Sequence, residues 1–278
     1  MMGESFSIVS GGKGANQAVA CARMGCAASL VGVVGGDSFA RVALDSLARF
    51  GVGTEQVHRA KHSRTGTAFI VVDASGENTI LVIPGANNDF SVDFIERSSD
   101  CIAGADALLV QLEVPLRITE RAMTIAHRAG VPILLDPAPA RPVPDRLLAL
   151  ADFVVPNAQE TKILTGMDPA TLATAGKAAD ALHRRGVRNV VIKRGRQGCL
   201  VSMDGDRRNI PGLSVKPVDT VGAGDCFAGA LISAWLETRD LVQACRFANA
   251  ASSLKVQRPG PQTGIPSRRE VVALLKTL

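Results

Sequence analysis

The sequence predicts an α/β fold with a mostly parallel sheet, and three observations support this. Apolar runs of strand length alternate with longer segments of helical period, which is the pattern of βα units around a parallel sheet. The last third of the chain has helical patterning throughout. One segment breaks the alternation with two strand-like runs and no helix between them. The 278 residues are enough for one large domain with a sizeable core.

The expected elements follow from these patterns in chain order. Short apolar runs predict buried strands at residues 29–35, 105–111, 131–136, 152–156 and 188–193. Amphipathic segments that end at glycine predict helices at 37–51, 116–130 and 170–186. The C-terminal helices are expected at 224–237, 241–256 and 267–278. Residues 65–87 read as two strands joined by the turn "DASGEN", which predicts a hairpin of the kind that forms a lid or a dimer contact.

Composition narrows the class of protein. Hydrophobic residues make up 46% and charged residues 21% of the chain, as in an ordinary soluble domain. The longest apolar run, "AGALISAWL", is too short to cross a bilayer, so no membrane association is expected. The first residues lack both the basic and the apolar region of an export signal. We therefore expect a cytoplasmic protein.

Charge and cysteine usage exclude further classes. The net charge of +5 and the pI near 9.1 favour an anionic ligand, but basic and acidic residues are interspersed. The chain has no tyrosine and few aromatic residues, which argues against platforms for stacking nucleic-acid bases. Six scattered cysteines form no CxxC pair, so neither disulfides nor a zinc site is expected. The sequence predicts a small-molecule partner and no nucleic acid.

The stretch "DTVGAGDCFAGAL" carries the most specific chemistry. Gly222 and Gly224 permit a tight turn, and the helix that follows adds unpaired N–H donors and a positive dipole end. This arrangement predicts an anion site. Asp225 beside it would repel a phosphate but is well placed to take a proton from an alcohol that attacks one. The competing interpretation is that Asp225 only stabilises the first helical turn.

Two further stretches place polar residues at helix starts. "GGKGANQAVACARMG" contains a second glycine-rich turn, and neither glycine cluster fits the spacing of a P-loop or a dinucleotide-binding motif. Two such turns indicate one site for a polar small molecule and one for phosphates. In "PNAQETKILTG", Asn157 and Glu160 have capping-box spacing, so helix capping explains them without any function. No histidine pattern has metal-ligand spacing.

Taken together, these stretches resemble the PfkB carbohydrate-kinase family and, within it, the ribokinase branch. "GGKGANQAVA" and "DTVGAGDCFAGAL" resemble the two family signatures, and "QLEVP", "DPAPAR", "PNAQET" and "FANAA" occur in the family's order. The likeness runs from Phe6 almost to the C-terminus. It implies a ribokinase-like three-layer α/β sandwich with a small β lid. The implied division is a lid remnant at 1–10, an α/β kinase domain at 11–64 and 85–278, and a lid hairpin at 65–84.

The resemblance also implies roles at the reacting centre. Asp225 would be the base that activates the primary hydroxyl of a sugar, with backbone N–H groups of Gly222, Ala223 and Gly224 stabilising the transferring phosphoryl group. The sugar would be bound by residues of the first signature and of "QLE": Gly11, Gly12, Lys13, Asn16 and Glu113, together with Asp225.

The nucleotide and metal roles follow in the same way. ATP would contact the first helix turn of "PNAQET", the "KRGRQG" turn and the last helices: Asn157, Lys193, Arg194, Gly195, Gly198, Gly224 and Asn249. Glu160 would organise Mg²⁺ through water, a role compatible with capping. The implied K⁺ site comprises Asp219, Val221, Lys255, Arg258, Gly260 and Gly264. Lys255 and Arg258 are tolerable there only through their backbone oxygens, and Gly264 lacks the hydroxyl usual at its position.

The N-terminus departs from the family pattern. Ribokinase-like chains place a strand with a sugar-binding aspartate, and then a lid strand, before the first signature, which this chain reaches at Gly11. Loss of a strand from inside the sheet would leave two neighbours with unpaired backbone groups. Three explanations are open: a longer natural protein, a truncated copy, or a changed role without efficient turnover.

The resemblance implies ATP-dependent phosphorylation of D-ribose at its primary hydroxyl, giving ribose 5-phosphate, by a homodimer that pairs through the lid. Within the enzyme class, deoxyribose or another small sugar or nucleoside is the alternative substrate. Outside it, the alternative is a non-catalytic ligand-binding homologue, because the sugar-binding aspartate of the opening strand is missing.

Overall fold

The α/β architecture expected from the alternating pattern is present in the computed structural model, which describes residues 6–72, 78–203 and 205–278. The larger sheet has six strands, whose bounds are β5 (Leu108–Val110), β6 (Ile133–Leu135), β7 (Phe153–Val154), β8 (Asn189–Lys193), β9 (Cys199–Met203) and β10 (Asp206–Ile210). Pairing is parallel from β5 to β8, and β9 and β10 extend the sheet antiparallel. The sequence therefore identified the parallel strands and missed the antiparallel edge.

Two smaller sheets accompany it. β1 (Gly32–Gly35) pairs in parallel with β2 (Val57–Ala60), and β3 (Thr67–Val72) pairs with β4 (Asn78–Ile83) as the expected antiparallel hairpin. In the described part of the chain β1 and β5 belong to different sheets, and each has only one strand partner. Residues 6–10 of the expected lid remnant form no strand, whereas residues 1–5 of that remnant and 73–77 of the turn lie outside the described residues.

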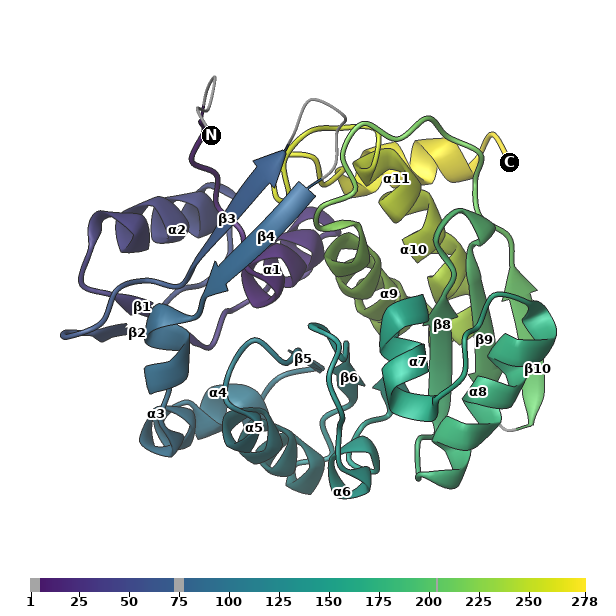
Figure 1. Cartoon of the computed structure of the whole chain (residues 1–278), viewed down its shortest axis with the longest axis horizontal. Helices are drawn as coiled ribbons and strands as arrows, with labels where there is room; N and C mark the ends of the chain where they lie inside the picture. Colours follow the sequence, from purple (N-terminus) through teal and green to yellow (C-terminus); the bar gives the residue numbers. More distant parts are fainter. Residues whose placement is uncertain (1–5, 73–77, 204) are drawn as a thin grey trace.

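Helices cover both faces of the larger sheet (Figure 1). Their bounds are α1 (Lys13–Arg23), α2 (Ser38–Arg49), α3 (Val92–Arg97), α4 (Ser99–Ala103), α5 (Leu116–Arg128), α6 (Asp145–Leu148), α7 (Ala158–Thr165), α8 (Leu172–Arg184), α9 (Ala223–Thr238), α10 (Leu241–Lys255) and α11 (Arg268–Leu275). Two short 3₁₀ turns span Gly85–Asp89 and Gly195–Gln197. No helix in the described ranges is long and apolar enough to span a membrane.

The core is divided by the sheet, because successive strand residues point to opposite faces. Leu134 and Val191 pack with α1, α9 and α10 in one cluster. Their neighbours Leu135 and Ile192 pack with α5 and α8 in the other. The result is the expected three-layer sandwich. Its helix α9 is apolar nearly all round, because it packs against α1 on one side and α10 on another.

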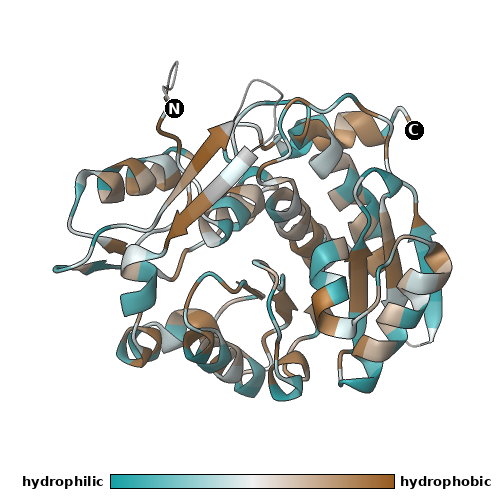
Figure 2. Ribbon diagram, in the orientation of Figure 1, coloured by the Kyte–Doolittle hydropathy of each residue, from teal (hydrophilic) through white to brown (hydrophobic). Residues whose placement is uncertain are grey.

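The hairpin is the exception to this burial. Figure 2 shows apolar colouring along β3 and β4, and Phe69 and Leu81, which face each other across the pair, are 56% and 61% exposed. Ile70 and Val82 on the opposite face of the hairpin are exposed as well. In the described structure both faces of this two-stranded sheet are therefore apolar and exposed.

Candidate active site

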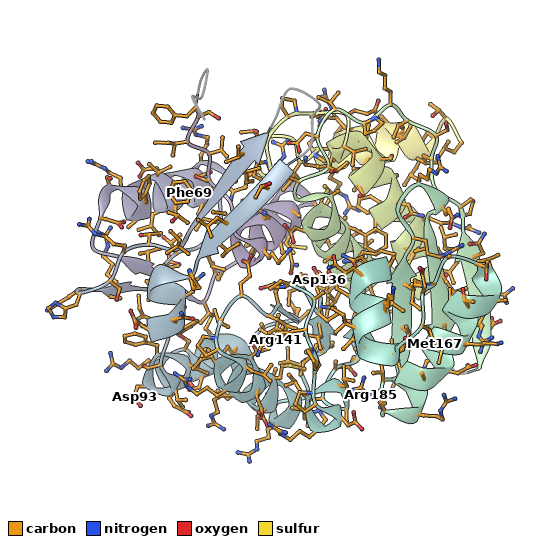
Figure 3. All side chains as sticks on the ribbon, in the orientation of Figure 1. Phe69, Asp93, Asp136, Arg141, Met167 and Arg185 are labelled. Atoms are coloured by element: carbon orange, nitrogen blue, oxygen red, sulfur yellow. The ribbon has the colours of Figure 1, made fainter. Side chains whose placement is uncertain are left out.

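Polar residues collect where the parallel strands of the larger sheet end. Glu113 follows β5, Asp136 follows β6, Asn157 follows β7, and Lys193 is the last residue of β8. The N-terminal ends of α1 and α9 come to the same place, since Asn16 and Gln17 of α1 bond to Asp225 of α9, and Gln17 also lies within bonding distance of Asp136. In Figure 3 Asp136 lies near the centre of the molecule. Ligands of α/β proteins bind at this edge of the sheet.

Asp225 stands in the first turn of α9, directly after the glycine-rich turn. Its side chain is nearly buried, with 5% of its residue surface exposed. Gly222 adopts a φ of 79°, and a side chain there would begin 2.9 Å from the Pro261 carbonyl oxygen. Only glycine therefore fits at position 222, which is the N-cap of α9. The turn brings the backbone of Gly222–Gly224 and the Asp225 carboxylate to one point, as the sequence predicts.

The three predicted N–H donors differ in whether they have a partner. The N–H of Ala223 donates to the carbonyl oxygen of Thr220 at 3.1 Å, so it is engaged inside the turn. The N–H groups of Gly222 and Gly224 have no partner among the described residues. A side chain at Gly224 would begin 3.5 Å from Nζ of Lys193, which places an ammonium beside the same turn. The turn therefore carries two N–H groups that are unpartnered in the described part of the chain, and one ammonium lies beside it.

Helix α1 supplies the partners of Asp225. Nδ2 of Asn16 donates to Oδ2 of Asp225 at 2.8 Å, and Nε2 of Gln17 lies 3.4 Å from Oδ1. Among the described residues Oδ1 of Asn16 is buried without any hydrogen-bond partner. An unpaired buried acceptor is costly, so its presence beside a carboxylate indicates a place for a ligand that donates a hydrogen bond.

The start of α1 also joins the predicted sugar residues. Gly12 has a φ of 92° and begins the helix, and the N–H of Lys13 donates to Oε2 of Glu113 at 2.8 Å. A side chain on Gly11 would begin 3.9 Å from the Pro261 ring, on the loop that also closes over Gly222. The structure thereby brings Gly11, Gly12, Lys13, Asn16 and Glu113 to the same end of α1 as Asp225.

A buried network that the sequence analysis missed supports this centre. Asp136 is 1% exposed and accepts hydrogen bonds from Nζ of Lys193 at 2.8 Å and from Nε2 of Gln17 at 2.9 Å. Gln111 in turn donates to Oε1 of Gln17. Asp136 thus connects the lysine beside the glycine turn to the glutamine beside Asp225. Its position after a parallel strand was the signal that could have identified it.

Several of the predicted nucleotide residues lie at the start of α7 and in the turn after β8. Asn157 and Glu160 form a full capping box at α7: Nδ2 and N of Asn157 each donate to Glu160 at 2.7 Å, and N of Glu160 donates back at 2.9 Å. Arg194 donates to the carbonyl oxygens of Pro169 and Ala170. Beside α7 a cavity of about 260 Å³ is lined by Ala158, Pro169, Ala170, Arg194, Arg196 and Gln197.

The turn after β8 depends on two glycines. Gly195 and Gly198 have φ values of 57° and 88°, and a side chain on Gly198 would collide with the carbonyl oxygen of Ile210. Asn249, another of the predicted nucleotide residues, lies on α10, and its Nδ2 donates to the carbonyl oxygen of Pro211 at 3.3 Å. This contact ties α10 to the segment after β10.

Burial and charge shift the titration of these groups. Burial raises the pKa of Asp225, the positive charge of Lys13 lowers it, and the net effect is a pKa above the ordinary value. Burial likewise raises the pKa of Glu113 and of Glu160. Burial lowers the pKa of Lys193, but Asp136 and Glu160 outweigh this effect and keep it above the ordinary value. Lys193 is therefore a firmly charged ammonium among carboxylates.

Two segments contain the residues of the predicted cation site. One lies immediately before the glycine turn, and the other begins at the end of α10. Asp219 accepts hydrogen bonds from the N–H of Val221 at 2.9 Å and of Gly260 at 2.8 Å. Carbonyl oxygens of Arg258, Pro259 and Gly260 lie within 2.8 to 3.1 Å of the point where a side chain on Gly264 would begin. The sequence predicts only a backbone oxygen from Lys255 here. The structure instead directs its ammonium into the loop, where Nζ donates to the carbonyl oxygen of Asp219 at 2.9 Å.

Comparisons with known proteins show which sequences this chain is similar to. A sequence profile for the pfkB family carbohydrate kinases matches residues 2–268. The ribokinase of Haemophilus influenzae is 40% identical over 276 residues, which cover 99% of this chain and 90% of that protein. The deoxyribokinase of Salmonella typhi is 34% identical over 264 residues, which cover 95% of this chain and 86% of that protein.

A solved structure gives the same result for the fold. The structure of Arabidopsis thaliana ribokinase complexed with ribose and ATP is 31% identical to this chain and matches it with a TM-score of 0.93. The match covers 99% of this chain and 90% of that one.

Proposed function

The chain belongs to the PfkB family of carbohydrate kinases, and on that premise we propose that it transfers the γ-phosphoryl group of ATP to the primary hydroxyl of D-ribose, giving ribose 5-phosphate. The relatives named ribokinase and the neighbour complexed with ribose and ATP support this substrate pair. The observation that carries the proposal is the buried Asp225 carboxylate at a glycine turn, where two N–H groups and the nearby Oδ1 of Asn16 have no partner among the described residues.

These residues have complementary tasks in the reaction. Oδ1 of Asn16 would accept a hydrogen bond from a sugar hydroxyl, and Glu113 would accept another. The oxygen of the sugar's primary hydroxyl would form a bond to the γ-phosphorus, while the bond from that phosphorus to the leaving ADP oxygen breaks. Asp225 would take the proton that this hydroxyl loses. The N–H groups of Gly222 and Gly224 would stabilise the charge on the transferring group.

The nucleotide would approach from the side of α7. Asn157, Lys193, Arg194, Gly195, Gly198 and Asn249 remain its proposed contacts. Lys193 is the charged member nearest the glycine turn, so its ammonium would attract the phosphates toward Asp225. Arg194 and Arg196 add positive charge to the cavity beside α7.

Mg²⁺ fits the residues present. Each oxygen of Glu160 accepts one hydrogen bond from Asn157, which leaves lone pairs for metal-bound water, and the carboxylate of Asp136 lies on the same side of the site. Glu160 would therefore hold the ion through water. When bound, Mg²⁺ supplies neutralisation of the phosphate oxygens.

K⁺ does not fit its expected site in the same way. The carboxylate and the carbonyl oxygen of Asp219 already have a positive charge beside them, which the Lys255 side chain provides. We therefore assign no step of the reaction to K⁺.

The substrate has one alternative that a specific observation favours. The Salmonella typhi deoxyribokinase is 34% identical to this chain, so 2-deoxyribose is the second candidate sugar. Ribose and deoxyribose differ only at the 2-hydroxyl, and a site that hydrogen-bonds this hydroxyl would reject the sugar that lacks it.

The assembly belongs to the same proposal. We assign residues 65–84 to a lid and residues 11–64 and 85–278 to the kinase domain, with a homodimer formed through the lid. The apolar, exposed faces of β3 and β4 support this assembly, because contiguous apolar patches on a protein surface mark interaction sites. A cytoplasmic location stays a prediction.

The test is turnover by the purified chain with Asp225→Asn as the control. ATP consumption with Mg²⁺ should require D-ribose, and ³¹P NMR should identify a product phosphorylated at the 5-position. Asp225→Asn should lower kcat by about 10³-fold while nucleotide binding is kept, because only proton transfer is lost. Higher kcat/KM for deoxyribose would favour the second candidate. Ribose-independent ATP consumption, or full activity in Asp225→Asn, would contradict the proposal.

A further inference from the structure

Lys255 is the most unusual charged residue of the chain. It is the last residue of α10, and its residue surface is fully buried. Lysine is almost never fully buried unless its ammonium is paired, because removing the charge from water costs much free energy. The mechanism described above does not use this residue. Its burial therefore needs another explanation.

The surroundings of the ammonium are those of a cation site. Nζ donates to the carbonyl oxygen of Asp219 at 2.9 Å and lies 3.5 Å from its Oδ2. Carbonyl oxygens of Arg258, Pro259 and Gly260 converge next to Gly264 in the same loop. Carbonyl and carboxylate oxygens are the ligands that hard cations prefer. A single positive charge balances the single carboxylate.

The same loop holds the anion site in place. The N–H groups of Val218 and Asp219 both donate to the carbonyl oxygen of Val256, one residue beyond Lys255. Asp219 then accepts from the N–H of Val221, immediately before Gly222, and a side chain on Gly222 would touch Pro261. The contact of the Lys255 ammonium with Asp219 thus connects the end of α10 to the segment that precedes α9.

We propose that the ammonium of Lys255 is a tethered replacement for a free monovalent cation, so that this chain holds its anion-site loop without K⁺. The inference rests on the proposed function for its catalytic consequence. A K⁺ ion bound to the oxygens of Asp219 would meet a like charge, because the ammonium already lies 2.9 Å from the carbonyl oxygen and 3.5 Å from Oδ2 of that residue, and the ion would be repelled. The side chain brings the charge without the entropy loss of binding an ion from solution.

The first test compares cations at equal ionic strength, so that charge screening is constant. Activity and Tm of the wild-type chain are measured in KCl and in tetramethylammonium chloride, whose cation is too large for the loop. We expect the same kcat and the same Tm in both salts. Stimulation of wild-type turnover by K⁺, or a K⁺-induced rise in its Tm, would overturn the proposal.

The second test removes the tethered charge. Lys255→Ala opens the loop and leaves Asp219 unbalanced, so K⁺ should now raise both its Tm and its kcat, the latter several-fold, toward the wild-type value. Lys216→Ala, which removes an exposed lysine from the segment leading to the loop, is the matched control and should behave as wild type. A folded Lys255→Ala whose Tm is indifferent to K⁺ would overturn the proposal.

A third variant keeps the test decisive if Lys255→Ala does not fold. Lys255→Met keeps the aliphatic stem and fills the space without the charge, so its kcat should fall and K⁺ should not restore it. Wild-type activity in Lys255→Met would overturn the proposal. The Tm measurements need no turnover, so failure of the kinase assignment is distinguished from failure of this inference.

Discussion

At the scale of a single residue, the proposed role of Asp225 as a base conflicts with its burial. A base must be ionised to accept a proton, yet burial in this site favours its neutral form. The hydrogen bond from Asn16 and the charges of Lys13 and Lys193 moderate the conflict. The network from Gln17 to Asp136 fixes the same side chains in position, because each of its members is buried and bonded to the next.

The raised pKa of Asp225 predicts an acid limb in the pH profile of activity. The base form disappears as pH falls through its folded-state pKa, which lies above the value of about 3.9 for an ordinary aspartate. As pH is lowered, kcat/KM for ribose should begin to decline at a pH above the ordinary aspartate pKa. The measurement is of initial rates in buffers of constant ionic strength. An acid limb at or below the ordinary aspartate pKa would contradict the assignment.

The raised pKa of Asp225 affects stability in the opposite direction to activity: activity needs the ionised form, whereas folding favours the protonated form. A carboxyl group whose pKa is raised by folding binds its proton more tightly in the folded state. Its contribution to the free energy of unfolding is therefore present at low pH and is lost as pH rises through the folded-state pKa. Asp225→Asn should accordingly match or exceed the wild-type Tm at neutral pH while losing activity, which is the exchange of stability for function common at catalytic carboxylates.

Among the secondary-structure elements, the contact of α1 with α9 sets the distance between the sugar-binding residues and the base. Gly229 lets the two helices approach, because a side chain there would begin 2.5 Å from Cβ of Ala20 and 2.8 Å from the carbonyl oxygen of Gln17. Asn16 and Gln17 on α1 reach Asp225 on α9 only at this separation.

Gly229→Ala tests this contact. The added methyl must push the helices apart, so the free energy of unfolding should fall by about 1–3 kcal/mol in urea titrations, and kcat should fall with it. The control is Gly176→Ala in α8, where the nearest atom belongs to the movable guanidinium of Arg207. That variant should keep its activity and lose no stability, because alanine is the better helix former. Unchanged kcat and stability in Gly229→Ala would show that the contact can relax.

At the scale of the whole molecule, the hairpin is the only element of the described structure whose two faces are both apolar and exposed. Pairing with a second copy would cover Phe69 and Leu81 and remove their area from water. This burial is the physical reason for the proposed homodimer.

Leu81→Asp tests the dimer. A charge at the centre of a buried interface is costly, so the variant should sediment as a monomer at concentrations where the wild-type chain is a dimer. Leu172→Asp, on an exposed position of α8 away from the hairpin, should leave the assembly unchanged. A monomeric wild-type chain in analytical ultracentrifugation, or a dimeric Leu81→Asp, would contradict the proposal.

The local patterns of the sequence were sufficient for the α/β class, the strands 29–35 to 188–193, the hairpin and the glycine turn before Asp225. Each of these depends on residues that are neighbours in the chain, so periodicity and turn chemistry reveal them. The strands β9 and β10 escaped because a glycine turn and polar residues obscure their alternation. The resemblance added roles that no local pattern determines.

Only the tertiary structure decided what joins these parts. It showed that Asp136 bonds to Gln17 and Lys193, residues separated from it by 119 and 57 positions. It also showed that the N–H of Ala223 donates a hydrogen bond within the turn. The ammonium of Lys255 donates to the carbonyl oxygen of Asp219, 36 residues away. Such contacts depend on how helices and strands pack, and packing is set by the whole core rather than by any one stretch of the chain.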